Sequence, residues 1–174
     1  MGEKTLYAAA EIAAAIQRLA TEIARLGEAP VLVGIHTGGV PLAGRLAAAL
    51  RAATGKEIPQ GTLDITLYRD DLAGRALPEV RGSNIDCDLE GRRVVLVDDV
   101  LFTGRTVRAA LNELADYGRP SRVQLCVLVD RGHRELPICA DYAGFRVETR
   151  KQDRVRVRLT ETGAARDEVV LVQE

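Results

Sequence analysis

Two adjacent aspartates, Asp98 and Asp99, stand at the end of an apolar run and are the first residues that could do chemistry. Like charges side by side repel, so we expect another group to balance them. Carboxylates accept hydrogen bonds from a pair of sugar hydroxyls, and Mg²⁺ prefers a few carboxylates together with ligand oxygens. A pair that only caps a loop at the end of a strand is the structural alternative.

The loop Thr103-Gly104-Arg105-Thr106 follows the aspartates and opens directly onto a predicted helix. Glycine lets the backbone approach a ligand, and the N–H groups at a helix N-terminus bind phosphate with help from the helix dipole. An ordinary helix cap with turn residues would explain the same loop. The sugar hydroxyls and the 5′-phosphate are neighbouring groups of a nucleotide, and the aspartates and the loop are neighbours in this sequence. Together they favour a nucleotide site.

A second glycine-rich turn, "GIHTGGVPLAG" at 34–44, also leads into a predicted helix and could seat another phosphate. Simple turn chemistry is its alternative. The turn matches neither GxGxxG nor GxxxxGK[ST], which argues against a Rossmann dinucleotide site and a P-loop NTPase. Arg69 heads the long polar stretch 70–90 and could swing over an anionic ligand, or it could form an exposed salt bridge.

The elements that must position these residues alternate between helix and strand. Helical periodicity predicts helices over 8–26, 41–53 and 105–117, and apolar or alternating runs predict strands over 31–35, 62–70, 93–97, 122–129, 154–159 and 168–172. This order is typical of an α/β fold with a mainly parallel sheet. Ligands of such sheets sit outside the carboxyl ends of the strands, where the loops 36–39, 98–106 and 130–134 begin.

Composition limits the classes of protein that remain. The 174 residues suffice for one domain, 1–174, and the net charge of −1 excludes a general polyanion binder. Three cysteines without a CxxC read as free thiols, and two histidines make a structural zinc site improbable. Glu3 and Glu11 argue against a signal peptide, and no apolar run approaches a membrane span. We therefore expect a cytoplasmic protein with no membrane role.

Several motifs carry a resemblance to a known family. "VVLVDDVLFTGRT" resembles the phosphoribosyl pyrophosphate (PRPP) signature of the type I phosphoribosyltransferases. "LDITLYRDDL" and "GRPSRVQLCVLVDRGHRELPICADY" resemble one branch closely: the bifunctional pyrimidine-operon attenuation regulators that are also uracil phosphoribosyltransferases. The resemblance covers nearly the whole chain. It implies a parallel sheet flanked by helices, with a small hood region over the active site.

The resemblance also implies a reaction, in which uracil and PRPP give UMP and pyrophosphate with the assistance of Mg²⁺. It makes Asp98, Asp99 and Arg69 the catalytic residues, with both aspartates on the ribose hydroxyls and available to the metal held by PRPP. Uracil would lie beside Val129, Asp130 and Arg131. The implied PRPP-binding residues, besides the two aspartates, are Thr37, Gly38, Gly39, Val100, Leu101, Phe102, Thr103, Gly104, Arg105 and Thr106.

One departure concerns the pyrophosphate loop. The family usually has Lys-Thr-Arg-Gly, whereas this chain has His36-Thr37-Gly38-Gly39 and lacks the basic side chain at Gly38. We expect activity to survive with a weaker pyrophosphate contact, because backbone N–H groups do the binding. Gly38 is also the feature that favours an alternative, a nucleotide-sensing RNA-binding regulator without catalysis. A type I phosphoribosyltransferase for a purine or for orotate is another alternative, against which "VLVDRGHRELP" argues.

The family further implies uridine-nucleotide-dependent (UMP or UTP) binding to pyrimidine leader mRNA, and a homodimer or homotetramer. The segment 146–158 holds six basic and two acidic residues, and such a patch suits recognition of an A-form backbone. An exposed strand face guarded by charge is the alternative. Where the family's first helix presents a threonine and a histidine, this chain has Gln17 and Thr21. The candidate RNA-binding residues are Arg18, Arg146, Arg150, Lys151, Arg154 and Arg156.

Overall fold

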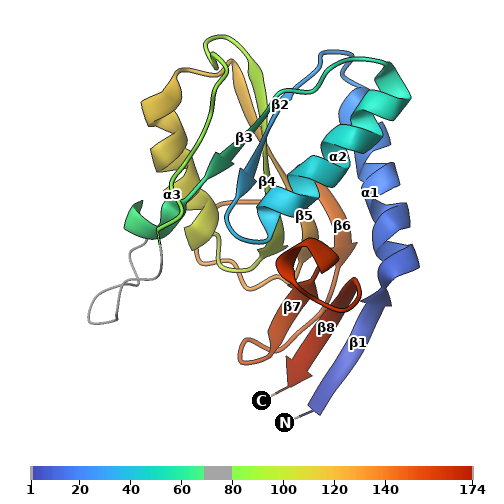
Figure 1. Ribbon diagram of the computed structural model, residues 1–174. Coiled ribbons are helices and arrows are strands. Elements are labelled where there is room, and N and C mark those ends of the chain that lie inside the picture. The colour runs from blue at the N-terminus through green and yellow to red at the C-terminus, as the bar shows by residue number, and fades with distance from the viewer. Residues whose placement is uncertain (1, 69–79, 174) are drawn as a thin grey trace.

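A five-stranded sheet forms the centre of the molecule, and every pair of neighbouring strands in it is parallel. The computed structural model describes residues 2–68 and 80–173. The strand order is β3-β2-β4-β5-β6, as seen in Figure 1. This confirms the predicted α/β fold with a mainly parallel sheet. The strands are β2 (Val31–Ile35), β3 (Gln60–Leu63), β4 (Arg93–Leu101), β5 (Arg122–Asp130) and β6 (Tyr142–Arg146).

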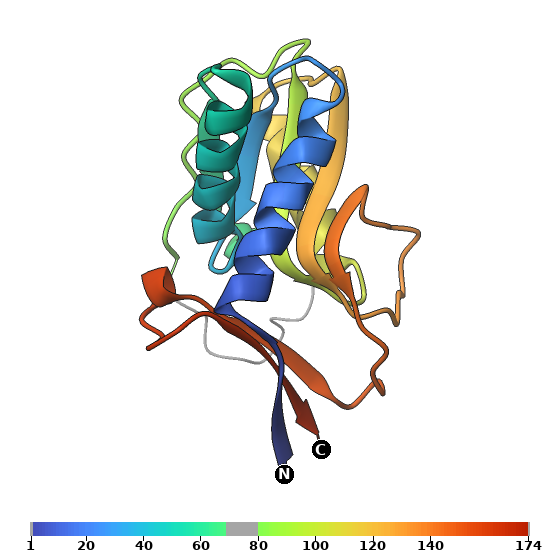
Figure 2. The ribbon, with the colours of Figure 1, turned by 90° about the vertical axis from the view of Figure 1, so that its right-hand side faces the viewer.

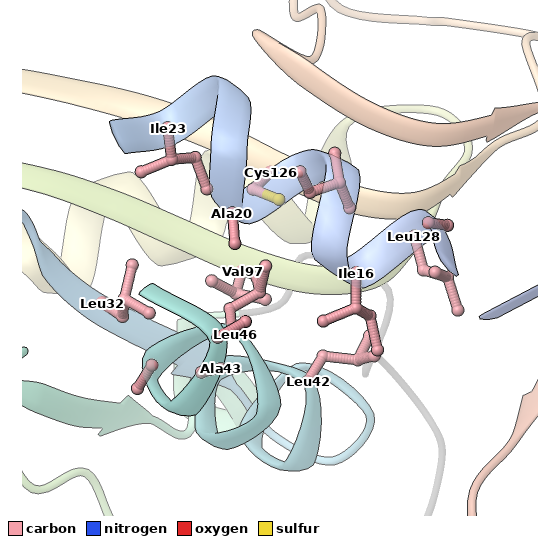
Figure 3. Packing of buried hydrophobic residues seen from close by; sticks show 14 of the residues in the cluster. Ile16, Ala20, Ile23, Leu32, Leu42, Ala43, Leu46, Val97, Cys126 and Leu128 are labelled. Atoms are coloured by element: carbon pink, nitrogen blue, oxygen red, sulfur yellow. The ribbon is translucent and has the colours of Figure 1, made fainter. Parts of the chain in front are cut away.

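Helices cover both faces of this sheet. The helices α1 (Ala9–Ala24) and α2 (Gly39–Thr54) lie on one face, and α3 (Arg105–Leu114) lies on the other (Figures 1 and 2). The apolar stripe predicted for the first helix is buried as far as Ile23, since Ile12, Ile16 and Ile23 are all at most 4% exposed. Leu26, predicted to belong to it, lies beyond the end of α1 and is 49% exposed. Figure 3 shows this stripe packing with α2 and the sheet in one apolar cluster. Hydrophobic burial of these faces fixes the loops at the strand ends.

A second, antiparallel sheet of three strands lies beyond the carboxyl ends of the central strands (Figures 1 and 2). Its order is β1-β8-β7, made of β1 (Gly2–Ala8), β8 (Glu168–Gln173) and β7 (Arg154–Arg158), so it brings the two ends of the chain together. Arg45 on α2 pairs with Glu161 and Asp167 in the chain between β7 and β8. This small sheet occupies the place expected of the hood.

The strand predicted over 62–70 is confirmed only for residues 62–63 and is wrong for 65–68, while residues 69 and 70 lie outside the described part of the chain. β3 ends at Leu63, and Ile65–Tyr68 form a 3-10 helix that leaves Leu67 69% exposed. The reason is local: the Asp64 carboxylate accepts hydrogen bonds from the backbone N–H (3.0 Å) and the hydroxyl (2.6 Å) of Thr66. Such a side-chain acceptor competes with the strand ladder and turns the chain.

Other boundaries differ in ways that bear on the site. β4 continues to Leu101, so Asp98 and Asp99 belong to the last residues of the strand rather than to a loop. The helix predicted to reach 117 ends at Leu114 and continues as a 3-10 turn, Ala115–Tyr117. β1 and β6 were not predicted, because neither shows a clean apolar alternation. None of the helices in the described ranges is both long and apolar enough to cross a membrane.

Candidate nucleotide site

Three loops meet at the carboxyl edge of the central sheet, as the sequence predicted. β2 pairs with β4 and β4 pairs with β5, so the segments that follow these strands are neighbours. Figure 1 shows this edge turned toward the three-stranded sheet. The loop after β4 leads into α3, and the one after β2 leads into α2. Parallel strands therefore place two helix N-termini and the acidic end of β4 side by side.

Within the described residues the aspartate pair, of which Asp98 is buried and Asp99 half-buried, has no protein counter-charge. Asp98 is 6% exposed, and among residues 2–68 and 80–173 no cationic side chain pairs with it or with Asp99. Burial, and then the charge of Asp99, raise the pKa of the Asp98 carboxyl well above its usual value. Burial likewise raises the pKa of Asp99. The pair is thus costly to ionise until a ligand or a cation arrives.

A pocket of about 330 Å³ opens beside the start of α3. Gly104, immediately before the helix, has a left-handed φ of +94°, which a glycine adopts without strain and which directs the chain into the helix. The N–H groups of the first helical turn and the threonine hydroxyls are donors suited to a phosphate. We call this the α3 pocket. Its lining consists of Asp98, Val100, Leu101, Phe102, Thr103, Gly104, Arg105, Thr106, Val107 and Glu135.

A second pocket, of about 380 Å³, lies on the other side of Asp98. We call it the β2 pocket because the loop after β2 forms one wall. Asp98, Val100 and Thr106 line both pockets, so the two cavities adjoin. The complete lining is His36, Thr37, Gly38, Asp64, Ile65, Thr66, Arg81, Asp98, Asp99, Val100 and Thr106. Two adjoining cavities that share the Asp98 carboxylate suit a ligand with a phosphate at each end.

The glycines of the loop after β2 allow it to approach the acidic end of β4. A Cβ atom on Gly39 would overlap the carbonyl oxygen of Val97, and one on Gly38 would overlap the carboxylate of Asp99. The His36–Thr37 peptide bond is cis. Gly38 therefore brings backbone rather than a side chain to the pocket wall.

Arg81 is a cation at the β2 pocket that sequence reasoning missed, whereas Arg69 lies outside the described residues. The backbone of Arg81 is anchored by Asp64, whose carboxylate accepts N–H bonds from Arg81 and from Gly82 (3.1 Å). Burial alone would raise the pKa of Asp64, but the hydrogen bonds from Thr66, Arg81 and Gly82 outweigh it and lower the pKa to about 2. Asp64 is therefore a fully engaged anion, unlike Asp98.

The three residues predicted to meet uracil lie beside the α3 pocket rather than in its wall. Val129 is fully buried, and the Asp130 carboxylate accepts hydrogen bonds from the Gly132 N–H (3.0 Å) and from Arg134. The Arg131 guanidinium lies 4.0 Å from the centroid of the Phe102 ring. Burial lowers the pKa of Arg131.

Arg134 ties this segment to the phosphate side. Its guanidinium donates to the carbonyl oxygens of Phe102 (2.6 Å), Gly132 (3.2 Å) and Ile138 (3.0 Å). These acceptors belong to the loop after β4 and the segment after β5, so one side chain holds the two in register. A base lying on the β5 side would consequently be fixed relative to a sugar phosphate in the α3 pocket.

Comparison with known proteins identifies the family. Residues 2–159 match the model of the phosphoribosyl transferase domain. The chain is 54% identical to bifunctional protein PyrR of Herpetosiphon aurantiacus, over 100% of this chain and 99% of the relative. It is 53% identical to bifunctional protein PyrR of Thermus thermophilus, over 90% of this chain and 88% of the relative. The chain belongs to the PyrR family of phosphoribosyltransferases.

Solved structures support the fold beneath that family. The hypoxanthine phosphoribosyltransferase of Trypanosoma cruzi superposes with a TM-score of 0.73 at 20% identity, over 98% of this chain and 96% of that one. A hypoxanthine-guanine phosphoribosyltransferase of Bacillus anthracis gives a TM-score of 0.67 at 20% identity, over 85% of each chain. The type I phosphoribosyltransferase fold predicted for this PyrR family member is confirmed.

The basic residues predicted to bind RNA come from several elements, and some of them are paired within the protein. Arg18 on α1 donates to the carbonyl oxygen of Gly144 in β6, the strand that ends at Arg146. Arg154 and Arg156 lie instead on β7 in the other sheet. Between them, Arg150 pairs with Asp153 (2.9 Å) and Lys151 pairs with Glu135 (3.1 Å). Several of the charges counted in this segment are therefore already balanced within the protein.

Proposed function

We propose that this chain transfers the ribose 5-phosphate of PRPP to uracil, forming UMP and pyrophosphate, and that the same nucleotide site controls its binding to pyrimidine leader mRNA. Membership of the PyrR family supports both activities. The observation that carries the catalytic half is the pair of adjoining pockets across the unbalanced Asp98–Asp99 pair. The α3 pocket takes the 5′-phosphate, and the β2 pocket takes the pyrophosphate.

The aspartates bind the ribose between these two ends. Their oxygens accept hydrogen bonds from the 2′- and 3′-hydroxyls, and their charge lies beside a sugar that becomes cationic in the transition state. Displacement at an anomeric carbon passes through an oxocarbenium-like state, as in glycoside hydrolysis. Negative groups fixed in advance near developing positive charge stabilise that state without reorganisation. Asp98 and Asp99 thus act by position and charge rather than as nucleophiles.

The site also fits a divalent cation. Asp98 and Asp99 are carboxylates without a protein cation, and they are the residues that would hold Mg²⁺ together with oxygens of PRPP. When bound, Mg²⁺ neutralises charge on the departing pyrophosphate.

Orientation of the base is the task of the β5 side. Val129 and Asp130 in β5 pair with Val100 and Leu101 in β4, which line the α3 pocket, so this segment lies beside that pocket. Phe102 is covered by Arg131 and by the edge of the His133 ring, whose centroid is 6.0 Å away. Holding both reactants in this geometry supplies much of the rate enhancement.

The test is UMP formation from labelled uracil and PRPP with Mg²⁺, run beside hypoxanthine and orotate as competing bases. UMP as the main product supports the proposal, and preferred use of another base contradicts the assignment of uracil. A gel shift with a pyrimidine leader RNA, with and without UMP, examines the second activity. Nucleotide-dependent retention of RNA without any turnover would instead favour a sensor that has lost catalysis.

A further inference from the structure

The β2 pocket has an excess of negative charge. Asp64, Asp98 and Asp99 all line it, whereas a pyrophosphate group placed there is itself strongly anionic. Among the described lining residues Arg81 carries the one permanent positive charge. Anions of this kind are recognised through charge-assisted hydrogen bonds, and the planar guanidinium of arginine matches phosphate oxygens particularly well.

Arg81 lies against the loop that forms the pocket wall. It lines the β2 pocket together with His36 and Thr37, and it lines a neighbouring cavity of about 440 Å³ together with the same two residues. Because Arg81 lines both cavities, it lies where they meet, at the edge of the β2 pocket. Its side chain is exposed and available to a ligand.

The backbone of Arg81 is held firmly although its side chain is exposed. Asp64 is 8% exposed and uses one carboxylate oxygen for Thr66 and the other for the N–H groups of Arg81 and Gly82. Ser83 adds a third tie, because its hydroxyl oxygen accepts the Asp64 N–H (2.7 Å). The end of β3 thereby fixes where Arg81 leaves the backbone.

We propose that Arg81 contacts the pyrophosphate group in the β2 pocket, and that Asp64 is the positioning residue that keeps Arg81 there. This inference rests on the proposed function and adds to it a ligand residue on the pyrophosphate side. The division of labour follows from the geometry: the α3 pocket binds the phosphate that UMP retains, and Arg81 serves only the group that leaves.

The experiment compares two ligands that separate the two pockets. In the Arg81→Gln variant the dissociation constant for pyrophosphate with Mg²⁺, and KM for PRPP, rise about tenfold, as expected for loss of one charge-assisted contact. The dissociation constant for UMP stays within about twofold, because UMP has no pyrophosphate group for Arg81 to contact. Arg81→Lys keeps the charge without the fork and shows an intermediate loss.

Asp64→Asn tests the positioning role. An amide offers one acceptor oxygen where the carboxylate offers two, so the ties to Thr66 and to Arg81 cannot both be kept. Pyrophosphate affinity should fall in the same direction as in Arg81→Gln, and adding Asp64→Asn to Arg81→Gln should produce little further loss. Arg122 begins β5, at the amino end of the sheet, whereas the pocket lies at the carboxyl end. Arg122→Gln therefore removes the same charge far from the pocket and serves as the matched control.

Two results would overturn the inference: unchanged pyrophosphate affinity in Arg81→Gln, or equal losses for pyrophosphate and UMP. Retained UMP binding verifies that each variant is folded. A wild-type protein that binds UMP but neither PRPP nor pyrophosphate would contradict the catalytic proposal itself. A wild type that binds all three, with no selective effect of Arg81→Gln, would contradict only the role of Arg81.

Discussion

The carboxyl edge of the central sheet and the basic segment 146–158 treat charge in opposite ways. At the sheet edge Asp98 is buried and Asp99 is half-buried, and neither has a cationic partner in the described part of the chain. In the basic segment Arg150 pairs with Asp153, and Arg158 pairs with Glu3 (2.6 Å) and Glu168 (2.9 Å). A buried charge that the protein leaves unbalanced marks a ligand site more reliably than a count of charges in the sequence.

We expect the largest effect on activity from substitutions in the aspartate pair. Asp98→Asn and Asp99→Asn each remove a negative charge beside the cationic sugar, and turnover should fall about 100-fold or more. Steady-state UMP formation measures the loss, with uracil and PRPP both saturating. Turnover within a few-fold of wild type in both variants would show that the carboxylates are structural caps.

Asp64 provides the contrasting case of a carboxylate that the protein does satisfy. Asp64→Asn should lower the free energy of unfolding by about 2 kcal/mol at pH 7, because the pKa of Asp64 in the folded protein is about 2. A depressed pKa stabilises the fold above the ordinary aspartate value of about 4, and that contribution is lost as pH falls toward 2.

Denaturant unfolding of wild type and Asp64→Asn at several pH values measures this difference. It should be constant from pH 5 to pH 8 and should shrink below about pH 4. A difference that does not vary with pH would mean that the hydrogen bonds to the carboxylate do not depress its pKa.

The sequence predicted the residues of the loop after β4 more completely than the residues and strands that hold the site in place. The family resemblance implied that all seven residues from Val100 to Thr106 bind PRPP, and all seven line the α3 pocket, because they are consecutive residues at the end of β4 and in the loop after it. Arg81 was missed because its position depends on hydrogen bonds to Asp64, 17 residues earlier in the chain. β1 was missed because it shows no clean apolar alternation and is held by its pairing with β8, near the other end of the chain. Contacts at such separations leave no periodicity to read.

Pairing should also decide which basic residues are available to RNA. Arg156 is exposed and takes part in no ion pair within the described residues, whereas Arg158 is held by two carboxylates. Arg156→Ala should therefore weaken the gel shift and reduce its salt slope by about 1. Arg158→Ala should lower the melting temperature with little effect on RNA. The reverse pattern would show that internal ion pairs do not limit the RNA surface.

The smallest expected effect on ligand affinity concerns Glu135, an acidic residue in the wall of the α3 pocket. Glu135 lines the α3 pocket and pairs with both Arg105 (3.1 Å) and Lys151 (3.1 Å). Glu135→Gln removes a charge that repels phosphate and competes for Arg105, so UMP should bind about two- to fivefold more tightly. Uridine, which has no phosphate, should bind unchanged. Glu148 is exposed and lies near Arg150 and Lys151, so Glu148→Gln is the matched control. Titration calorimetry measures the binding of UMP and of uridine to wild type and to both variants.

The central claim is that ligand and metal, not the protein, balance the charge of Asp98, and melting temperature with and without ligand tests it most directly. Without ligand at pH 7, Asp98→Asn should melt higher than wild type, because the raised pKa of Asp98 makes its ionised form a penalty in the folded state. That advantage should shrink as pH falls toward about 4 and vanish below about 3, where the carboxyl is protonated in both the folded and the unfolded state. With saturating PRPP and Mg²⁺ the order should reverse, and wild type should melt higher. The same order of melting temperatures in both conditions would contradict the account.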